Sequence, residues 1–174
     1  QSAHNISDIS FFVFLISKIY IMLKNKFTNS PYKVITWKDS QNTGAIGWIV
    51  IYNLINKVCG GGLFMASNAS LPEVIDLAET MSFKNSLQNP MFGGGKGGIR
   101  FDPKHPDAKQ VLKRFLVDNT EIIRDEWCTG GDINTSTDEI TELMVNHSNI
   151  QSPFQCLAQM LENKSKIPIN LDQF

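Results

Sequence analysis

The most informative stretch of the sequence is Pro90-Met-Phe-Gly-Gly-Gly-Lys-Gly-Gly-Ile-Arg-Phe-Asp-Pro103, because it sets one lysine, Lys96, among five glycines. Its glycines satisfy the G-x-G-x-x-G pattern of dinucleotide-binding loops. Such a loop follows a strand and opens a helix, whereas a helix is predicted before these glycines and a short strand, Gly98–Asp102, after them. A Walker A loop is excluded because no Ser or Thr follows the lysine. A phosphate or nucleotide site would require a helix after this predicted loop.

The segments on either side alternate between strand and helix patterns. Two β-type runs, Tyr32–Trp37 and Ile46–Tyr52, flank turn-forming residues 39–44 and predict a hairpin. This alternation indicates an α/β fold, a single three-layer domain with a mixed, largely parallel sheet flanked by helices. The other predicted elements are a strand over Gly60–Ala66 and helices over Leu71–Gln88, about Asp107–Arg124, from Ser136 onward and Phe154–Lys166.

Length and composition favour one ordinary domain without nucleic acid as a partner. The 174 residues are 42% hydrophobic and carry a net charge of −1, so no basic field is available for a phosphate backbone. The apolar run Ile9–Leu23 is interrupted by Lys18 and is shorter than the roughly 18–20 residues of a membrane span. It predicts an N-terminal interface helix, with no membrane as a partner.

Three cysteines, Cys59, Cys128 and Cys156, are widely spaced and form no CxxC pair. Their odd number fits neither a disulfide framework nor a tetrahedral zinc site. The pattern predicts a cytoplasmic protein without a bound metal.

Lys96 is the one side chain in its glycine run that can perform acid–base chemistry. A buried ammonium, or one close to another cation, has a lowered pKa and can act as a base near neutral pH. Lys84 supplies a second cation, at a position where the stripe of the preceding predicted helix calls for a core residue. The alternative is a solvated lysine in a flexible turn.

These residues resemble a family signature. Phe83-Lys-Asn-Ser followed by residues 90–103, with Lys84 and Lys96 separated by 12 positions, is similar to the Glu/Leu/Phe/Val dehydrogenases, in their N-terminal substrate-binding and dimerisation domain. Gly131-Asp132-Ile133 resembles the segment of the family's catalytic aspartate. The resemblance covers Lys33 to Val145. It implies a core over 31–145, the interface helix over 1–30 and a divergent helical tail over 146–174.

The resemblance implies a role for each matching residue. Lys84 would bind the substrate α-carboxylate, Lys96 would be the base of lowered pKa that activates water, and Asp132 would relay protons to the amino group. The implied reaction is the oxidative deamination of an amino acid, with NAD or NADP as hydride acceptor, in a homo-oligomer. The family's coenzyme-binding Rossmann domain is absent from this sequence, so we expect this chain alone to bind no cofactor and to be inactive.

One departure from the family concerns substrate choice. Members that act on glutamate carry K-G-G-x-R, and here Gly60 stands at the lysine position and Phe64 at the arginine position. Lys57 is offset by three residues. We expect a pocket without a cation, formed by Gly60, Gly61, Gly62 and Leu63, in which Gly61 and Gly62 bind the substrate. Such a pocket favours an apolar amino acid or a bulkier substrate over glutamate, because an unpaired side-chain carboxylate would be costly to desolvate there.

A second function from another class stays open. The same fold could act as a noncatalytic homo-oligomerisation module, using the apolar N-terminal helix and a sheet edge as its interface. The two lysines and Asp132 favour the enzyme, since a module that only oligomerises needs no such groups.

Overall fold

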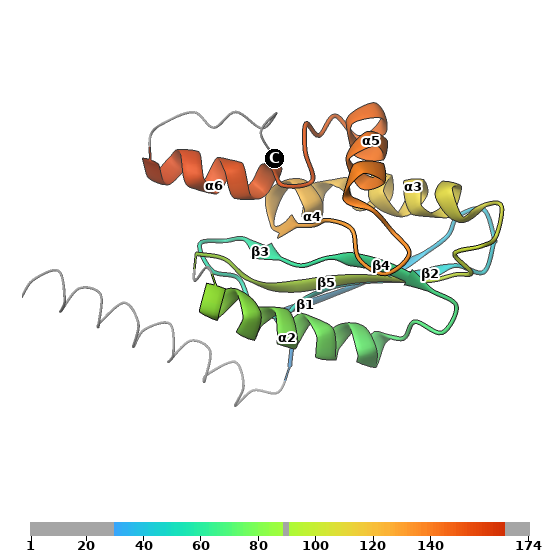
Figure 1. Cartoon of the computed structure of the whole chain (residues 1–174), viewed down its shortest axis with the longest axis horizontal. Coiled ribbons are helices and arrows are strands. Elements are labelled where there is room, and N and C mark those ends of the chain that lie inside the picture. The colour runs from blue at the N-terminus through green and yellow to red at the C-terminus, as the bar shows by residue number, and fades with distance from the viewer. Residues whose placement is uncertain (1–29, 89–90, 166–174) are drawn as a thin grey trace, which may run out of the picture. The chain divides into compact units, whose positions relative to one another are not determined.

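Residues 30–88 and 91–165 are described by a computed structural model (Figure 1). The predicted interface helix over Ile9–Leu23 lies outside these residues. None of the helices in the described ranges is both long and apolar enough to cross a membrane.

One mixed sheet organises the described chain. Its strands run in the order β1-β2-β5-β3-β6, and β4 also pairs with β5. The β1–β2 and β2–β5 pairs are antiparallel, and β5 pairs with both β3 and β4 in parallel, as β3 does with β6. The strands are β1 (Lys33–Lys38), β2 (Ile46–Ile51), β3 (Cys59–Gly60), β4 (Leu63–Ala66), β5 (Gly93–Arg100) and β6 (Trp127–Cys128).

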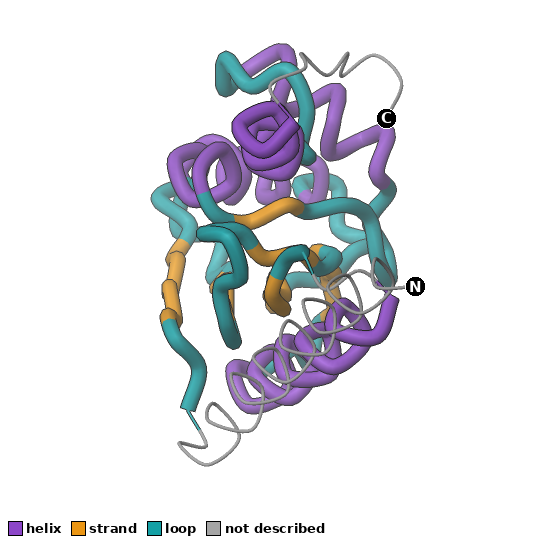
Figure 2. The backbone as a smooth tube through the Cα atoms, turned by 90° about the vertical axis from the view of Figure 1, so that its left-hand side faces the viewer, coloured by secondary structure: helices purple, strands orange, loops and turns teal. Residues whose placement is uncertain are grey.

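Helices cover both faces of this sheet, which confirms the predicted three-layer α/β fold (Figures 1 and 2). Helix α2 lies on one face, and α3, α4 and α5 lie on the other. The helices are α2 (Leu71–Gln88), α3 (Ala108–Asp118), α4 (Thr120–Asp125), α5 (Thr137–His147) and α6 (Gln155–Ser165).

The single helix predicted over about 107–124 is wrong, because two helices meet at Asn119. The buried Asn119 side chain donates a hydrogen bond to the carbonyl of Phe115, 2.8 Å away. An asparagine that bonds the backbone locally competes with helix propagation. The break separates α3 from α4, and Ile123 still reaches the core.

The glycine run is the largest difference between prediction and structure. Gly93–Gly98 is part of strand β5, whereas the sequence predicted a loop with a strand only from Gly98. The groups that cover the two faces of the sheet approach β5 so closely that its glycine positions have no room for side chains. A Cβ on Gly94 would lie 2.1 Å from the backbone nitrogen of Ser82 in α2, and one on Gly97 would lie 2.4 Å from the ring of Trp127 on the opposite face.

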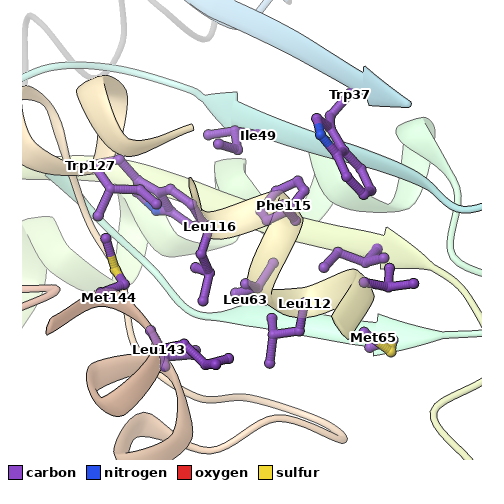
Figure 3. Close-up of a cluster of buried hydrophobic side chains, with 14 of the residues drawn as sticks. Trp37, Ile49, Leu63, Met65, Leu112, Phe115, Leu116, Trp127, Leu143 and Met144 are labelled. Carbon is purple, nitrogen blue, oxygen red and sulfur yellow. The ribbon is translucent and has the colours of Figure 1, made fainter. Parts of the chain in front are cut away.

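The main core lies between the sheet and helices α3 to α5 (Figure 3). Trp127 and Phe115 are its largest fully buried side chains. The rings of Trp37 and Phe115 meet edge-on, with centroids 5.4 Å apart. Because glycine leaves the middle of β5 bare, Trp127 can lie directly against that strand. A second cluster fills the space between the sheet and α2.

Candidate functional site

Strand β5 places Lys96 on the face covered by α2. Side chains alternate along a strand, and Gly94 and Gly98, two positions away on either side, both contact α2. Lys96 lies opposite Val50 of β2, which is buried in the cluster under α2. Its side chain is 8% exposed. An ammonium group is thus buried on a largely apolar face, where its charge requires a partner.

Asp132 supplies that partner from the turn after β6. Its Oδ2 accepts a hydrogen bond from Lys96 Nζ, and the two side chains form an ion pair. The Asp132 side chain is 29% exposed, so the pair is open to solvent on the aspartate side only. The structure therefore brings together the two residues that the sequence predicted as catalytic.

Short hydrogen bonds fix the Asp132 carboxylate. The backbone amide of Ile133 donates to Asp132 Oδ1 over 2.8 Å, which leaves Oδ2 directed to the lysine. The Asp132 amide donates to Thr135 Oγ1 over 3.0 Å, and that hydroxyl donates to the carbonyl of Leu63 over 2.5 Å. Thr135 thus ties the turn to strand β4.

The predicted strand over Gly60–Ala66 is interrupted at Gly61 and Gly62, between β3 and β4. A Cβ on Gly61 would lie 1.7 Å from the carbonyl oxygen of Gly95, and one on Gly62 would lie 3.0 Å from Cβ of Asp132. These glycines therefore allow the chain to pass close to β5 and to the aspartate. Their predicted contact with substrate stays a prediction.

Lys84 lies near the end of α2, and its side chain is exposed. It forms no ion pair with any residue in the described ranges. The next residue, Asn85, is buried and donates from Nδ2 to the carbonyls of Gly60 and Gly93, over 3.0 and 2.7 Å. These two bonds fix the helix turn that carries Lys84 against the two glycine segments. Binding of a carboxylate by Lys84 stays a prediction.

The positions expected to select glutamate are apolar. Phe64 is buried between the sheet and α2, and the Cβ position of Gly60 lies 2.7 Å from the ring of Phe92. Lys57 is exposed in the tight turn between Ile55 and Val58. Leu63 belongs to the core on the other face of the sheet, so the predicted pocket that included it is wrong in that residue.

Sequence reasoning missed three contributors to the site. They are Thr135, Asn85 and Trp127, whose indole nitrogen donates to the carbonyl of Gly61 over 3.1 Å. A threonine three residues after an aspartate was a readable signal for a side-chain turn. Nothing in the local sequence indicates the other two contacts, because they link segments far apart in the chain.

The glycine run cannot hold a phosphate in the manner of a nucleotide-binding loop. Its backbone groups belong to the ladder with β2, β3 and β4, and no helix opens directly after it. Within residues 30–88 and 91–165, no cluster of three or more His, Cys, Asp or Glu side chains is arranged to hold a metal ion.

Solved structures share this fold at low sequence identity. The hetero-hexameric glutamate dehydrogenase from Thermus thermophilus, in its leucine-bound form, superposes with a TM-score of 0.61 at 20% identity, over 81% of this chain and 38% of that chain. The L-tryptophan dehydrogenase from Nostoc punctiforme superposes with a TM-score of 0.55 at 19% identity, over 74% of this chain and 38% of that chain.

Sequence comparison gives the family. The NADP-specific glutamate dehydrogenase of Agaricus bisporus is 30% identical over 126 residues, which is 69% of this chain and 28% of that protein. The chain thus spans less than a third of that relative's length. The family described as Glu/Leu/Phe/Val dehydrogenase, dimerisation domain, matches residues 31–149. This chain therefore belongs to the Glu/Leu/Phe/Val dehydrogenase family, through the dimerisation domain of those enzymes.

Proposed function

We propose that this chain provides the substrate-binding and dimerisation domain of an NAD(P)-dependent amino acid dehydrogenase, which converts an L-amino acid into a 2-oxo acid by oxidative deamination. The observation that carries the proposal is the ion pair between buried Lys96 and Asp132 on the α2 face. A buried lysine held by a carboxylate is a suitable acid–base pair, since either group can hold or transfer a proton.

Each group has a defined role in the proposed reaction. Once its own proton has passed to Asp132, Lys96 takes a proton from the water that attacks the iminium carbon, and the ammonium so formed stabilises the oxygen that develops there. Asp132 exchanges protons with the amino nitrogen, because its carboxylate is the member of the pair that solvent reaches. Lys84 binds the α-carboxylate from the end of α2.

In the proposed reaction, a bound nicotinamide coenzyme would supply the hydride acceptor. The described residues do not fit such a coenzyme, because their glycine run is a strand and not a turn before a helix. We therefore assign coenzyme binding to a part of the intact enzyme beyond these residues, and we expect residues 1–174 alone to be inactive.

The proposed substrate carries an apolar side chain. Support comes from the buried Phe64 and from the Phe92 ring beside Gly60, which leave no cation at either position. A glutamate side-chain carboxylate would lose its hydration there without a partner. Leucine or valine should be turned over faster than glutamate by the intact enzyme, and the reverse ranking would refute this part of the proposal.

Self-association is the second part of the proposed function. Strand β1 is an edge strand that pairs with β2 alone among the described strands. Tyr32, just before it, is 63% exposed, and Val34, within it, is 41% exposed. An exposed edge with apolar side chains favours pairing with another copy. Sedimentation of the chain should show an oligomer, whereas a strict monomer would refute this part.

Replacement of Lys96 in the intact enzyme tests the catalytic assignment. Lys96→Met keeps the approximate volume and removes the base, so we expect turnover to fall by about 10²- to 10⁴-fold. Lys109→Met is the matched control, since Lys109 is an exposed lysine of α3 that pairs with Glu142 of α5 over 3.6 Å, on the face of the sheet opposite α2. Near-normal turnover by Lys96→Met would instead favour the noncatalytic oligomerisation module.

A further inference from the structure

The segment beyond the family match packs into the same unit as the site. The match ends at residue 149, and residues 150–154 and α6 follow it. The segment shares a third apolar cluster with the β3 and β6 region. That cluster consists of buried Val58, Cys128, Cys156 and Met160, with Met91, Phe92, Phe154, Leu157 and Leu161 packed against them.

Three consecutive residues, Cys128, Thr129 and Gly130, each contact this segment. The buried side chains of Cys128 and Cys156 belong to this same cluster. The amide of Thr129 donates to the carbonyl of Pro153 over 3.2 Å. A Cβ on Gly130 would lie 3.7 Å from Cζ of Phe154. Strand β6 has only β3 as a strand neighbour in the described sheet, so the segment covers its other side.

The contact at Gly130 lies only two residues before Asp132. Thr137 Oγ1 accepts a hydrogen bond of 2.9 Å from the amide of Gly131, and it would lie 3.2 Å from a Cβ on Gly130. This hydroxyl and the Phe154 ring thus both lie beside Gly130, on the side where a Cβ would point. Asp132 follows two residues later, and its carboxylate meets Lys96.

We propose that Phe154 is a positioning residue, which holds the Gly130–Asp132 turn in place and thereby keeps the Asp132 carboxylate on Lys96. The proposal rests on the proposed function for its catalytic meaning, although the contact itself is independent of turnover. It assigns a role in the site to a residue outside the family-matched region. Loss of the ring frees Gly130, lets the turn move, and exposes the Lys96 ammonium.

Lysine acylation of the full chain measures this effect without any activity assay. The protein is treated briefly with N-acetoxysuccinimide, and acetylation of Lys96 is quantified by mass spectrometry relative to Lys84 as an internal reference. Lys96 is buried and paired, whereas Lys84 is exposed, so Lys96 should react slowly in the wild type. In Phe154→Ala the relative rate at Lys96 should rise several-fold.

Met160→Ala is the matched control, because it removes a buried side chain of the same cluster from α6, the helix that begins directly after Phe154. It should lower stability without raising the Lys96 rate under conditions where both variants remain folded by circular dichroism. Phe154→Leu retains part of the side-chain volume, so its relative acetylation rate at Lys96 should lie between those of the wild type and Phe154→Ala. Should Phe154→Ala not fold, Phe154→Leu compared with Met160→Leu carries the same test.

Two outcomes would overturn the proposal. One is an unchanged Lys96 rate in the Phe154 variants, and the other is an equal rise in the Met160 control. Both differ from a failure of the proposed function, which would show as near-normal turnover of Lys96→Met whatever the acylation rates are.

Discussion

Two buried ion pairs of this chain differ in how completely their hydrogen-bonding groups are used. Asp39, just after β1, receives both Arg114 Nε and Nη2 over 2.7 Å, Thr43 Oγ1 over 2.5 Å and the amide of Gln41 over 3.3 Å. Arg114 is the main reason that the pKa of Asp39 is lowered to about 2. This carboxylate is fully buried and has no accepting position left for another molecule.

The pair of Lys96 and Asp132 is built differently. A lysine ammonium has three donors, and Lys96 uses one of them on Asp132 among the described residues. The aspartate is also the solvent-accessible partner. A fully bonded pair serves the fold, whereas a pair with unused donors beside an exposed carboxylate can serve a substrate.

The largest expected effect on the free energy of unfolding comes from breaking the pair of Asp39 and Arg114. Asp39→Asn removes the charge while keeping the shape, so the Arg114 guanidinium loses its counter-charge in a mostly buried place. We expect a loss of about 3 kcal/mol in the free energy of unfolding, measured by urea denaturation. A loss below about 1 kcal/mol would place this pair among ordinary surface ion pairs and remove the contrast.

Lowering the pH should weaken the same pair, with a somewhat smaller loss in the free energy of unfolding than Asp39→Asn causes. The folded-state pKa of Asp39, about 2, lies below its ordinary value of 3.8, so the folded protein keeps this charge to lower pH than the unfolded chain does. The resulting stability, about 2 kcal/mol, is complete above about pH 4 and is lost as the pH falls toward about 2. Urea denaturation across this range measures it. Arg114→Lys, which lacks the planar fork, should flatten the dependence, and an unchanged slope would contradict the assignment.

The smallest expected effect is on the stability of the second pair. Lys96→Met replaces a buried charge by an apolar side chain next to Val50, and the remaining Asp132 can be hydrated because it is partly exposed. We expect the free energy of unfolding to change by less than about 1 kcal/mol, or to increase. A calorimetric scan of wild type and variant checks this. A loss as large as that of Asp39→Asn would mean that both pairs hold the fold.

The order of elements was predictable because its signals are local. Helix α2 runs over Leu71–Gln88 as its cap and proline predict, and Ser136 accepts a hydrogen bond from the amide of Glu139 at the start of α5. The extent of β5 was not predictable from its own residues. Glycine has little strand preference, and the segment is a strand because its neighbours on both edges and both faces define its path.

The charged residues of the site were predictable from the sequence, whereas the residues that hold them in place were not. Lys96 and Asp132 are 36 residues apart, and the family resemblance, not a local pattern, brought them together in advance. The contacts of Asn85 with Gly60 and of Phe154 with Gly130 join distant segments. Such contacts follow from tertiary packing, which no local pattern encodes.

The glycine-rich strand also has a genetic consequence. Every missense change that a single nucleotide can make in a glycine codon adds a side chain, and β5 contains five glycines between two packed layers. The gene segment for this strand is therefore a concentrated target for loss of the protein by mutation. In a saturation map of variants, these codons should stand out as a block of intolerance that comes from lack of space, whereas intolerance at the Lys96 codon would come from its chemistry.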